Sequence, residues 1–220
     1  MVNLESILSG INAKNERCWE QLYTSCYAAM CVYVESIVKV QPTGTELPVR
    51  ITLFQGMPKK DKLELIIQKA VELGACEIVP VMTKRTVVKL SEEKKINKRL
   101  ERWQSIAYAA AKQCDRGIIP TVHKPVSYEE ALAMADQLDY NVIPYELQTG
   151  MEEARKIVDQ ACKQRSLGIF IGPEGGFEPE EVERAMTRNI HPMTLGKRIL
   201  RTETAGMALL SILMFQMQGE

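Results

Sequence analysis

The sequence lacks the features that mark several large protein classes. Its 28 basic and 28 acidic residues leave no net charge, so a global positive field cannot be the argument for nucleic-acid binding. The six cysteines form no CxxC pair and the two histidines are not spaced with them as zinc ligands, so we expect no metal site. The longest apolar run near the start, 26–34, is too short to cross a bilayer, and no charged leader precedes it. We therefore expect reduced thiols and a cytoplasmic protein without a signal peptide or membrane span.

The two common nucleotide-binding loops are also missing. Neither GxxxxGK[ST] nor GxGxxG occurs, so the P-loop and dinucleotide-binding interpretations both fail. The composition is 45% hydrophobic and 25% charged, which is typical of a globular protein with a core. A length of 220 residues fits one large domain, or one of ordinary size with a small one beside it.

Charge is segregated along the chain even though it cancels overall. Residues 84–102 hold eight basic and three acidic residues, and residues 184–201 hold five basic and no acidic ones. Residues 128–160 reverse the balance, with eight acidic and two basic residues. Such segregation favours one positive face that binds a phosphate backbone, but solvated helix faces produce the same pattern.

Strand and helix signals alternate after residue 48, which predicts an α/β domain with a mainly parallel sheet. Short apolar runs predict strands over 50–55, 77–82, 118–122, 141–145, 167–171 and 193–195. Helical spacing predicts helices over 59–73, 94–114, 128–137, 151–163, 179–188 and 203–218. We expect Thr202 to be the N-cap of the last helix, and Ile212 and Phe215 to be buried by it. A turn at 41–44 and Pro48 mark a linker, so we divide the chain into 1–48 and 49–220.

Two glycine-containing loops follow predicted strands and lead into predicted helices. They are 172–177, which reads Gly-Pro-Glu-Gly-Gly-Phe, and 196–201, which reads Gly-Lys-Arg-Ile-Leu-Arg. Ligands of open α/β sheets bind at the carboxyl ends of strands, where glycine lets a ligand approach the backbone closely. A loop of the first kind can also be only a tight turn, so both interpretations stay open.

In their residues, order and spacing, these loops resemble those of the RsmE family, the 16S ribosomal RNA uridine-N3 methyltransferases of the SPOUT superfamily. The resemblance covers about residues 32–220 and rests on 171–177 and 195–205, with further matches at 53–56, 59–62, 78–80, 83–85 and 111–116. It implies a SPOUT-type α/β domain with a C-terminal trefoil knot, a homodimer, and S-adenosylmethionine as methyl donor. The implied substrate is uridine N3 in 16S rRNA of the small ribosomal subunit.

The resemblance also points to particular site residues. Uridine N3 carries a proton, so methyl transfer needs a base or a cation that stabilises negative charge on the uracil oxygens. The candidates are Arg116, Arg201 and Glu203. Glu203 has the alternative role of complementing the helix dipole, and Arg201 that of bracing its loop against Glu203 or Glu174. The implied donor-binding residues are Tyr145, Glu146, Leu147, Gly172, Pro173, Glu174, Gly175, Leu195, Gly196, Ile199, Leu200, Thr204 and Ala205.

The N-terminal region departs from the family pattern. RsmE-like proteins carry a PUA-like β-barrel there, whereas only 32–40 of this chain resembles the end of one, and 15–20 does not match the family's RNA-contact segment. We therefore expect a small, shortened and incomplete β-rich region over 1–48. Two alternatives remain: a SPOUT enzyme that methylates another RNA position, such as a ribose 2′-oxygen, and a catalytically impaired variant that only binds donor or RNA.

Overall fold

The computed structural model describes residues 44–87 and 93–218, all of which belong to one unit, Thr43–Glu220. Residues 32–40, which resemble the end of a PUA-like barrel, and the residues before them lie outside the described residues. The domain boundary at residue 48 stays a prediction.

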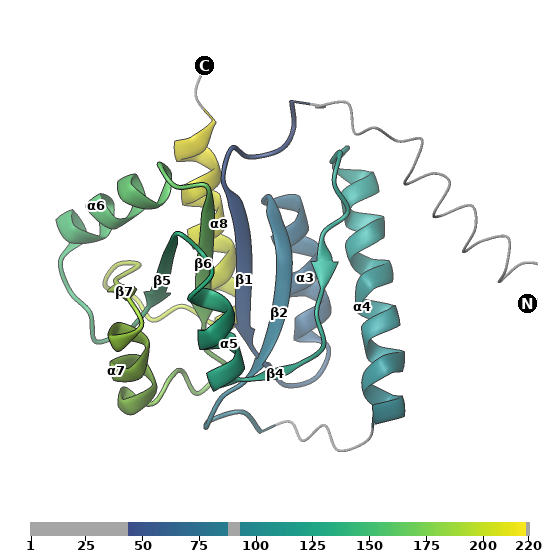
Figure 1. Cartoon of the computed structure of the whole chain (residues 1–220), viewed down its shortest axis with the longest axis horizontal. Helices are drawn as coiled ribbons and strands as arrows, with labels where there is room; N and C mark the ends of the chain where they lie inside the picture. The colour runs from purple at the N-terminus through teal and green to yellow at the C-terminus, as the bar shows by residue number, and fades with distance from the viewer. Residues whose placement is uncertain (1–43, 88–92, 219–220) are drawn as a thin grey trace, which may run out of the picture. The chain divides into compact units, whose positions relative to one another are not determined.

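A parallel sheet of seven strands forms the middle of the described unit (Figure 1). The strand order is β3-β2-β1-β6-β5-β7, and β4 also pairs with β2. The strands are β1 (Arg50–Gly56), β2 (Ala75–Met82), β3 (Thr121–Val122), β4 (Val126–Ser127), β5 (Tyr140–Pro144), β6 (Ser166–Ile171) and β7 (Ile190–Met193). Every pair is parallel, so the predicted α/β domain with a mainly parallel sheet is confirmed. The carboxyl ends of parallel strands share one edge, here called the carboxyl edge, which lies toward the bottom of Figure 1.

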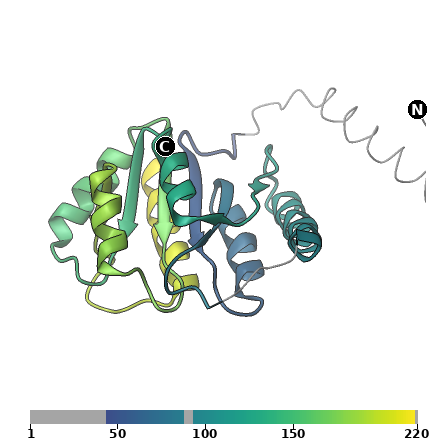
Figure 2. The same ribbon diagram turned by 60° about the horizontal axis from the view of Figure 1, so that its bottom comes forward.

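Helices cover both faces of this sheet (Figures 1 and 2). On one face, a core cluster includes side chains from α3 (Lys62–Glu72), α4 (Glu93–Gln113), α6 (Met151–Ala161) and α8 (Thr202–Met217). On the other, a second cluster includes side chains from α5 (Tyr128–Ala135) and α7 (Pro179–Thr187). Neighbouring strand residues feed the two clusters alternately, as Leu53 and Phe54 do, because successive side chains of a strand point to opposite faces. Phe54 stacks on Phe170 with ring centroids 4.4 Å apart.

Three predictions about local structure need correction. The strand predicted over 118–122 is only Thr121–Val122, since Pro120 before it has no N–H for a ladder. The strand predicted over 193–195 lies earlier, at Ile190–Met193, where His191 and Pro192 interrupt the apolar pattern. Thr202 is not an N-cap: α8 begins at Thr202 and Arg201 occupies the cap position.

The last helix also differs from its expected burial. Ile212 is 46% exposed and Phe215 is 82% exposed, whereas both were predicted to be buried. Because α8 is apolar on nearly all sides, periodicity cannot distinguish its packed face from its open one. Within 44–87 and 93–218, no helix is long and apolar enough to cross a membrane.

Candidate functional site

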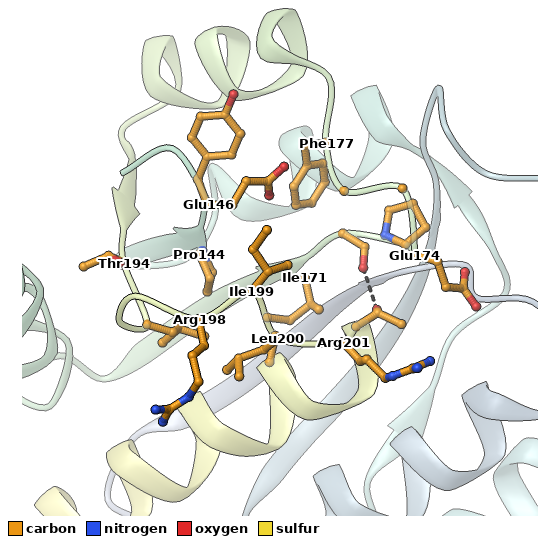
Figure 3. Close-up of a pocket in the computed structure, with 18 of the residues that line it drawn as sticks. Pro144, Glu146, Ile171, Glu174, Phe177, Thr194, Arg198, Ile199, Leu200 and Arg201 are labelled. Atoms are coloured by element: carbon orange, nitrogen blue, oxygen red, sulfur yellow. Dashed lines mark hydrogen bonds between the residues drawn. The ribbon is translucent and has the colours of Figure 1, made fainter. Parts of the chain in front are cut away.

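A cavity of about 280 Å³ lies at the carboxyl edge (Figure 3). Its lining comes from the end of β5, the loop after β6, the segment 194–201 after β7, and the first turn of α8. Lys62, the first residue of α3, completes it. The volume lies just below the range of about 300–1,000 Å³ found for small-molecule sites, and the position is where open α/β sheets bind ligands.

The cavity has an apolar middle and acidic sides. Figure 3 shows Ile171, Ile199 and Leu200 in the middle, with Glu146 and Glu174 on different sides. Ile171 is buried, but Ile199 is 86% exposed, so part of this apolar surface is open. Much of the remaining lining is the main chain of glycine-containing loops, which can offer N–H and C=O groups to a ligand.

A chain of hydrogen bonds fixes the loop after β6. The Gln55 amide donates from Nε2 to Thr202 Oγ1 over 2.8 Å, and Thr202 Oγ1 donates to the Gly172 carbonyl over 2.6 Å. Gln55 is 0% exposed and Thr202 6%. The chain joins the end of β1, the loop after β6 and the start of α8. Close approach requires glycine at position 56, because a Cβ there would lie 2.5 Å from the Pro173 nitrogen.

Lys62 bridges two acidic residues at the edge of the cavity. Its Nζ lies 3.3 Å from Glu174 Oε1 and 3.3 Å from Glu203 Oε2. Burial works to lower the pKa of Lys62, but hydrogen bonds to the two carboxylates outweigh it and raise this pKa above 10.5. Burial works to raise the pKa of Glu174, but its own backbone N–H, that of Lys59 and the Lys62 ammonium outweigh it and lower this pKa below 4.5. The Lys62–Glu174 pair is therefore ionised at neutral pH.

The loop after β2 also holds the loop that follows β6 in place. The Arg85 guanidinium donates to the Gly175 carbonyl over 2.5 Å and to both oxygens of Glu178 over 2.9 and 3.0 Å. This bidentate pair raises the pKa of Arg85 and lowers that of Glu178. Glu181, 1% exposed, accepts from the backbone N–H groups of Lys84 and Glu178 over 2.9 Å each. The backbone of 172–178 is thus held before any ligand binds.

Arg201 lines the cavity with an exposed side chain. It occupies the N-cap position of α8, but its side chain makes no capping hydrogen bond. Within the described part of the chain, its guanidinium has no hydrogen-bond or ion-pair partner. The carboxylates of Glu174 and Glu203 are instead paired with Lys62, so the structure does not support the alternative in which Arg201 braces its loop against them.

The structure brings together most of the predicted site residues. All the predicted donor-binding residues except Leu147 and Thr204 line the cavity, and Leu147 is 72% exposed outside it. Arg201 lines the cavity, and Glu203 reaches its edge through Lys62.

Arg116 is placed elsewhere, which argues against the catalytic role considered for it. Its guanidinium donates to the carbonyls of Val71 and Ala75 and forms an ion pair with Glu46 over 2.6 Å. Ala75 begins β2, so Arg116 lies at the amino edge of the sheet, opposite the cavity. Its side chain is 4% exposed and fully engaged in holding its own chain.

Sequence reasoning missed several lining residues: Lys62, Pro144, Ile171, Gly176, Phe177, Thr194, Arg198 and Thr202. Most adjoin predicted residues directly, so a wider window around each loop would have found them. Lys62 is the exception. It belonged to a matched segment, but nothing local indicated that it pairs with carboxylates more than a hundred residues later.

The chain is similar to proteins of known family. Residues 45–214 match the family model described as an RNA methyltransferase domain. A relative named ribosomal RNA small subunit methyltransferase E, from Bacillus subtilis, is 42% identical over 174 residues, covering 78% of this chain and 68% of the relative. One of the same name from Mesomycoplasma hyopneumoniae is 35% identical over 162 residues, covering 74% and 68%.

A solved structure agrees with these relatives. It is a ribosomal RNA small subunit methyltransferase E from Neisseria gonorrhoeae, crystallised with S-adenosylmethionine, and it is 35% identical to this chain. The TM-score is 0.66, and the match covers 78% of this chain and 68% of that one.

Proposed function

Because the chain belongs to the ribosomal RNA small subunit methyltransferase E family, we propose that it transfers a methyl group from S-adenosylmethionine to 16S ribosomal RNA. The resemblance drawn from its two glycine-containing loops is thereby confirmed at the level of the family. The observation that carries the proposal is the cavity at the carboxyl edge, which those same two loops enclose. We further propose uridine N3 as the acceptor atom, on the strength of the match at 195–205.

The residues of the cavity fit this methyl donor. When bound, the donor supplies a reactive methyl group on a positively charged sulfur. Glu146 is an exposed carboxylate suited to the donor's cationic groups, while Ile171, Ile199 and Leu200 suit the faces of its adenine. Gly196 adopts φ +109° with nothing within 4 Å of the place where a Cβ would stand, which leaves its backbone open to a ligand.

The chain's own residues then act on the uracil. Reaction requires the acceptor nitrogen to be held about 3–3.5 Å from the methyl carbon, and N3 must lose its proton to become nucleophilic. Arg201, a cation without a protein partner in the described region, stabilises the negative charge that develops on the uracil oxygens. Glu203, paired with Lys62, is the candidate acceptor for the proton.

The finer architecture is part of the same proposal. We propose a C-terminal trefoil knot built from the two cavity loops, a PUA-like region over 1–48, and a location in the cytoplasm, where ribosomal subunits are assembled. A homodimer is supported by the exposed apolar side chains of Ile199, Ile212 and Phe215, which are 86%, 46% and 82% exposed. No observation favours the ribose 2′-oxygen alternative.

The test is to incubate the protein with S-adenosylmethionine and small subunits that lack the modification, then to analyse the 16S rRNA nucleosides by mass spectrometry. We expect 3-methyluridine to appear with the wild-type chain and not with a Gly196→Val variant. A 2′-O-methylated nucleoside would replace the proposed target by the alternative. Donor binding without any methylated product would identify an impaired variant.

A further inference from the structure

The basic side chains of the described residues differ in whether they have partners. Many are paired within their own neighbourhood, as in the ion pairs Arg184–Glu129, Arg188–Asp136, Arg85–Glu178, Lys69–Glu72 and Arg116–Glu46. Others are exposed and have no ion-pair partner within 44–87 and 93–218, and five of these lie on the loop from β1 to α3 and in the first turns of α4. These five, here called the basic track, are Lys59, Lys60, Lys94, Lys98 and Arg99.

The part of the track on α4 lies at the carboxyl edge. Arg102 of α4 pairs with Glu64, in the first turn of α3, over 2.8 Å, which sets the two helices side by side (Figure 1). Lys98 and Lys94 precede Arg102 by about one and two turns, so at 1.5 Å per residue Lys94 lies about 12 Å farther along the helix. Since α4 follows β2 and runs back along the sheet, this extension points toward the edge that holds the cavity.

The remaining track residues lie between α4 and the cavity. Lys59 and Lys60 belong to the loop from β1 to α3, and the Lys59 backbone N–H donates to the Glu174 carboxylate over 3.1 Å. Lys62, two residues further on, lines the cavity itself. The cavity, the β1–α3 loop, the Glu64–Arg102 pair and the first turns of α4 therefore follow one another along the carboxyl edge.

An arrangement of this kind is electrostatically unfavourable in isolation. Lys94 and Lys98 are four residues apart on one helix, and like charges at that spacing repel. Of the acidic residues nearby, Glu64 is paired with Arg102 and Glu93 lies 4.0 Å from Lys124, whereas exposed Glu101, three residues after Lys98, offsets part of the charge. Exposed Asp61 is the one other carboxylate in the described β1–α3 loop. A polyanion laid along the edge would relieve the repulsion.

We propose that the basic track binds the phosphate backbone of the RNA strand next to the nucleotide that enters the cavity. This inference rests on the proposed function for the identity of the RNA. Apart from the Lys59 backbone N–H, which donates to Glu174, no track residue contacts or lines the donor cavity, so the role of the track is in substrate affinity. Binding of this type is independent of sequence, and each phosphate neutralised releases counterions, which makes the affinity depend on salt.

The test compares two triple variants of the full chain that remove the same charge. The track variant carries Lys60→Gln, Lys94→Gln and Lys98→Gln. The control carries Lys112→Gln, Arg155→Gln and Lys163→Gln, three exposed basic residues at the far end of α4, on α6 and just after it. Filter binding to 16S rRNA transcribed without modifications is measured over a series of potassium chloride concentrations. Calorimetry with S-adenosylmethionine reports on the donor pocket of each variant.

We expect the track variant to bind the RNA about tenfold more weakly at low salt, with a salt slope smaller by about 0.7 for each single-stranded phosphate that is no longer neutralised. The control should bind like the wild type, and donor affinity should be equal in all three proteins. Equal RNA affinity and slope in the two variants would overturn the basic track. If the wild-type chain methylates nothing but its RNA binding still depends on the track, the proposed function fails while this inference stands.

Discussion

The hydroxyl of Thr202 donates a 2.6 Å hydrogen bond to the carbonyl of Gly172, so the first residue of α8 holds the loop that follows β6. The same hydroxyl accepts from the Gln55 amide over 2.8 Å. One small side chain thereby joins three segments of the cavity wall that are distant in sequence.

Replacing Thr202 by valine removes both bonds while keeping the shape of the side chain. The buried Gln55 N–H and the Gly172 carbonyl are then without this partner, which costs about 1–3 kcal/mol for each buried group left unsatisfied. We expect Thr202→Val to unfold at lower urea concentration and to bind S-adenosylmethionine more weakly, whereas Thr202→Ser keeps both properties. Chemical denaturation and calorimetry provide the two measurements. Unchanged stability in the valine variant would show that the bonds contribute nothing.

The case of Thr202 shows what sequence reasoning can and cannot reach. A threonine before an apolar helical repeat is a sound N-cap prediction. The structure assigns its hydroxyl to Gly172 instead, and only tertiary contacts decide between the two uses. The order of the predicted strands and helices, by contrast, could be read from periodicity alone. Apolar runs, and the glycines that end them, are patterns among a few neighbouring residues.

The lining of the cavity could be predicted where its loops are local. Gly172 to Gly175, and Leu195, Gly196, Ile199 and Leu200, were predicted because each loop carries its own pattern of glycines after a strand, and all of them line the cavity. Lys62 and its two carboxylates were not recognised as a cluster, since folding brings together residues from the start and the end of the domain. The position of Arg116 at the amino edge could not be predicted for the same reason, because its matched segment gives no sign of which edge of the sheet it occupies.

Gly196 provides a test of the donor site. Its φ of +109° is strained for any residue with a Cβ, and its backbone borders the cavity. We expect Gly196→Val to lower the affinity for S-adenosylmethionine by at least about tenfold, because the loop must shift and the new side chain enters the space left for the ligand. Calorimetry measures this directly, with Gly150→Val as a control for strain at a positive-φ glycine outside the cavity. Unchanged affinity would remove Gly196 from the donor site.

Glu174 predicts a pH dependence of stability. Its pKa in the folded protein lies below the ordinary 4.5, so the carboxylate contributes stability that is complete above that pH and is lost as the pH falls through the folded value. We expect Glu174→Gln to be less stable than the wild type at neutral pH, and the gap to close under acidic conditions. Urea unfolding at a series of pH values gives the measurement. Glu183→Gln, an exposed position on α7, is the control and should show no such convergence. A gap that stays constant with pH would contradict the role of ionised Glu174.

The open face of α8 predicts how the chain associates. Phe215 is 82% exposed and Ile212 46%, and a stable interface buries about 1,600 Å² in total, for which such apolar side chains are suited. We expect light scattering at micromolar concentration to give the mass of a dimer for the wild type and of a monomer for the double variant Ile212→Glu, Phe215→Glu. Met186→Glu, at an exposed apolar residue on α7, should leave the dimer intact. A monomeric wild type would end the proposal of a homodimer.

Arg201 is expected to matter for turnover more than for donor binding. It occupies the cap position of α8, whose N-terminus already carries partial positive charge, and within the described residues nothing neutralises its guanidinium. Lys62 holds both Glu174 and Glu203, so these carboxylates are not available to turn Arg201 into a loop brace. A fixed cation there favours the negative charge that uracil develops as N3 loses its proton. Loss of one such stabiliser costs on the order of 10²–10³ in rate.

Arg201→Ala should therefore reduce methylation by about that factor while donor affinity and melting temperature stay near those of the wild type. Arg201→Lys should restore only part of the rate, because lysine keeps the charge but lacks the planar fork of donors. Lys197→Ala is the matched control, since this exposed cation of the same loop does not line the cavity. Single-turnover methylation of 16S rRNA, with calorimetry for the donor, separates the two effects. If the alanine variant loses donor affinity and stability together, Arg201 supports the loop; if it methylates at a near-normal rate, it has no part in the chemistry.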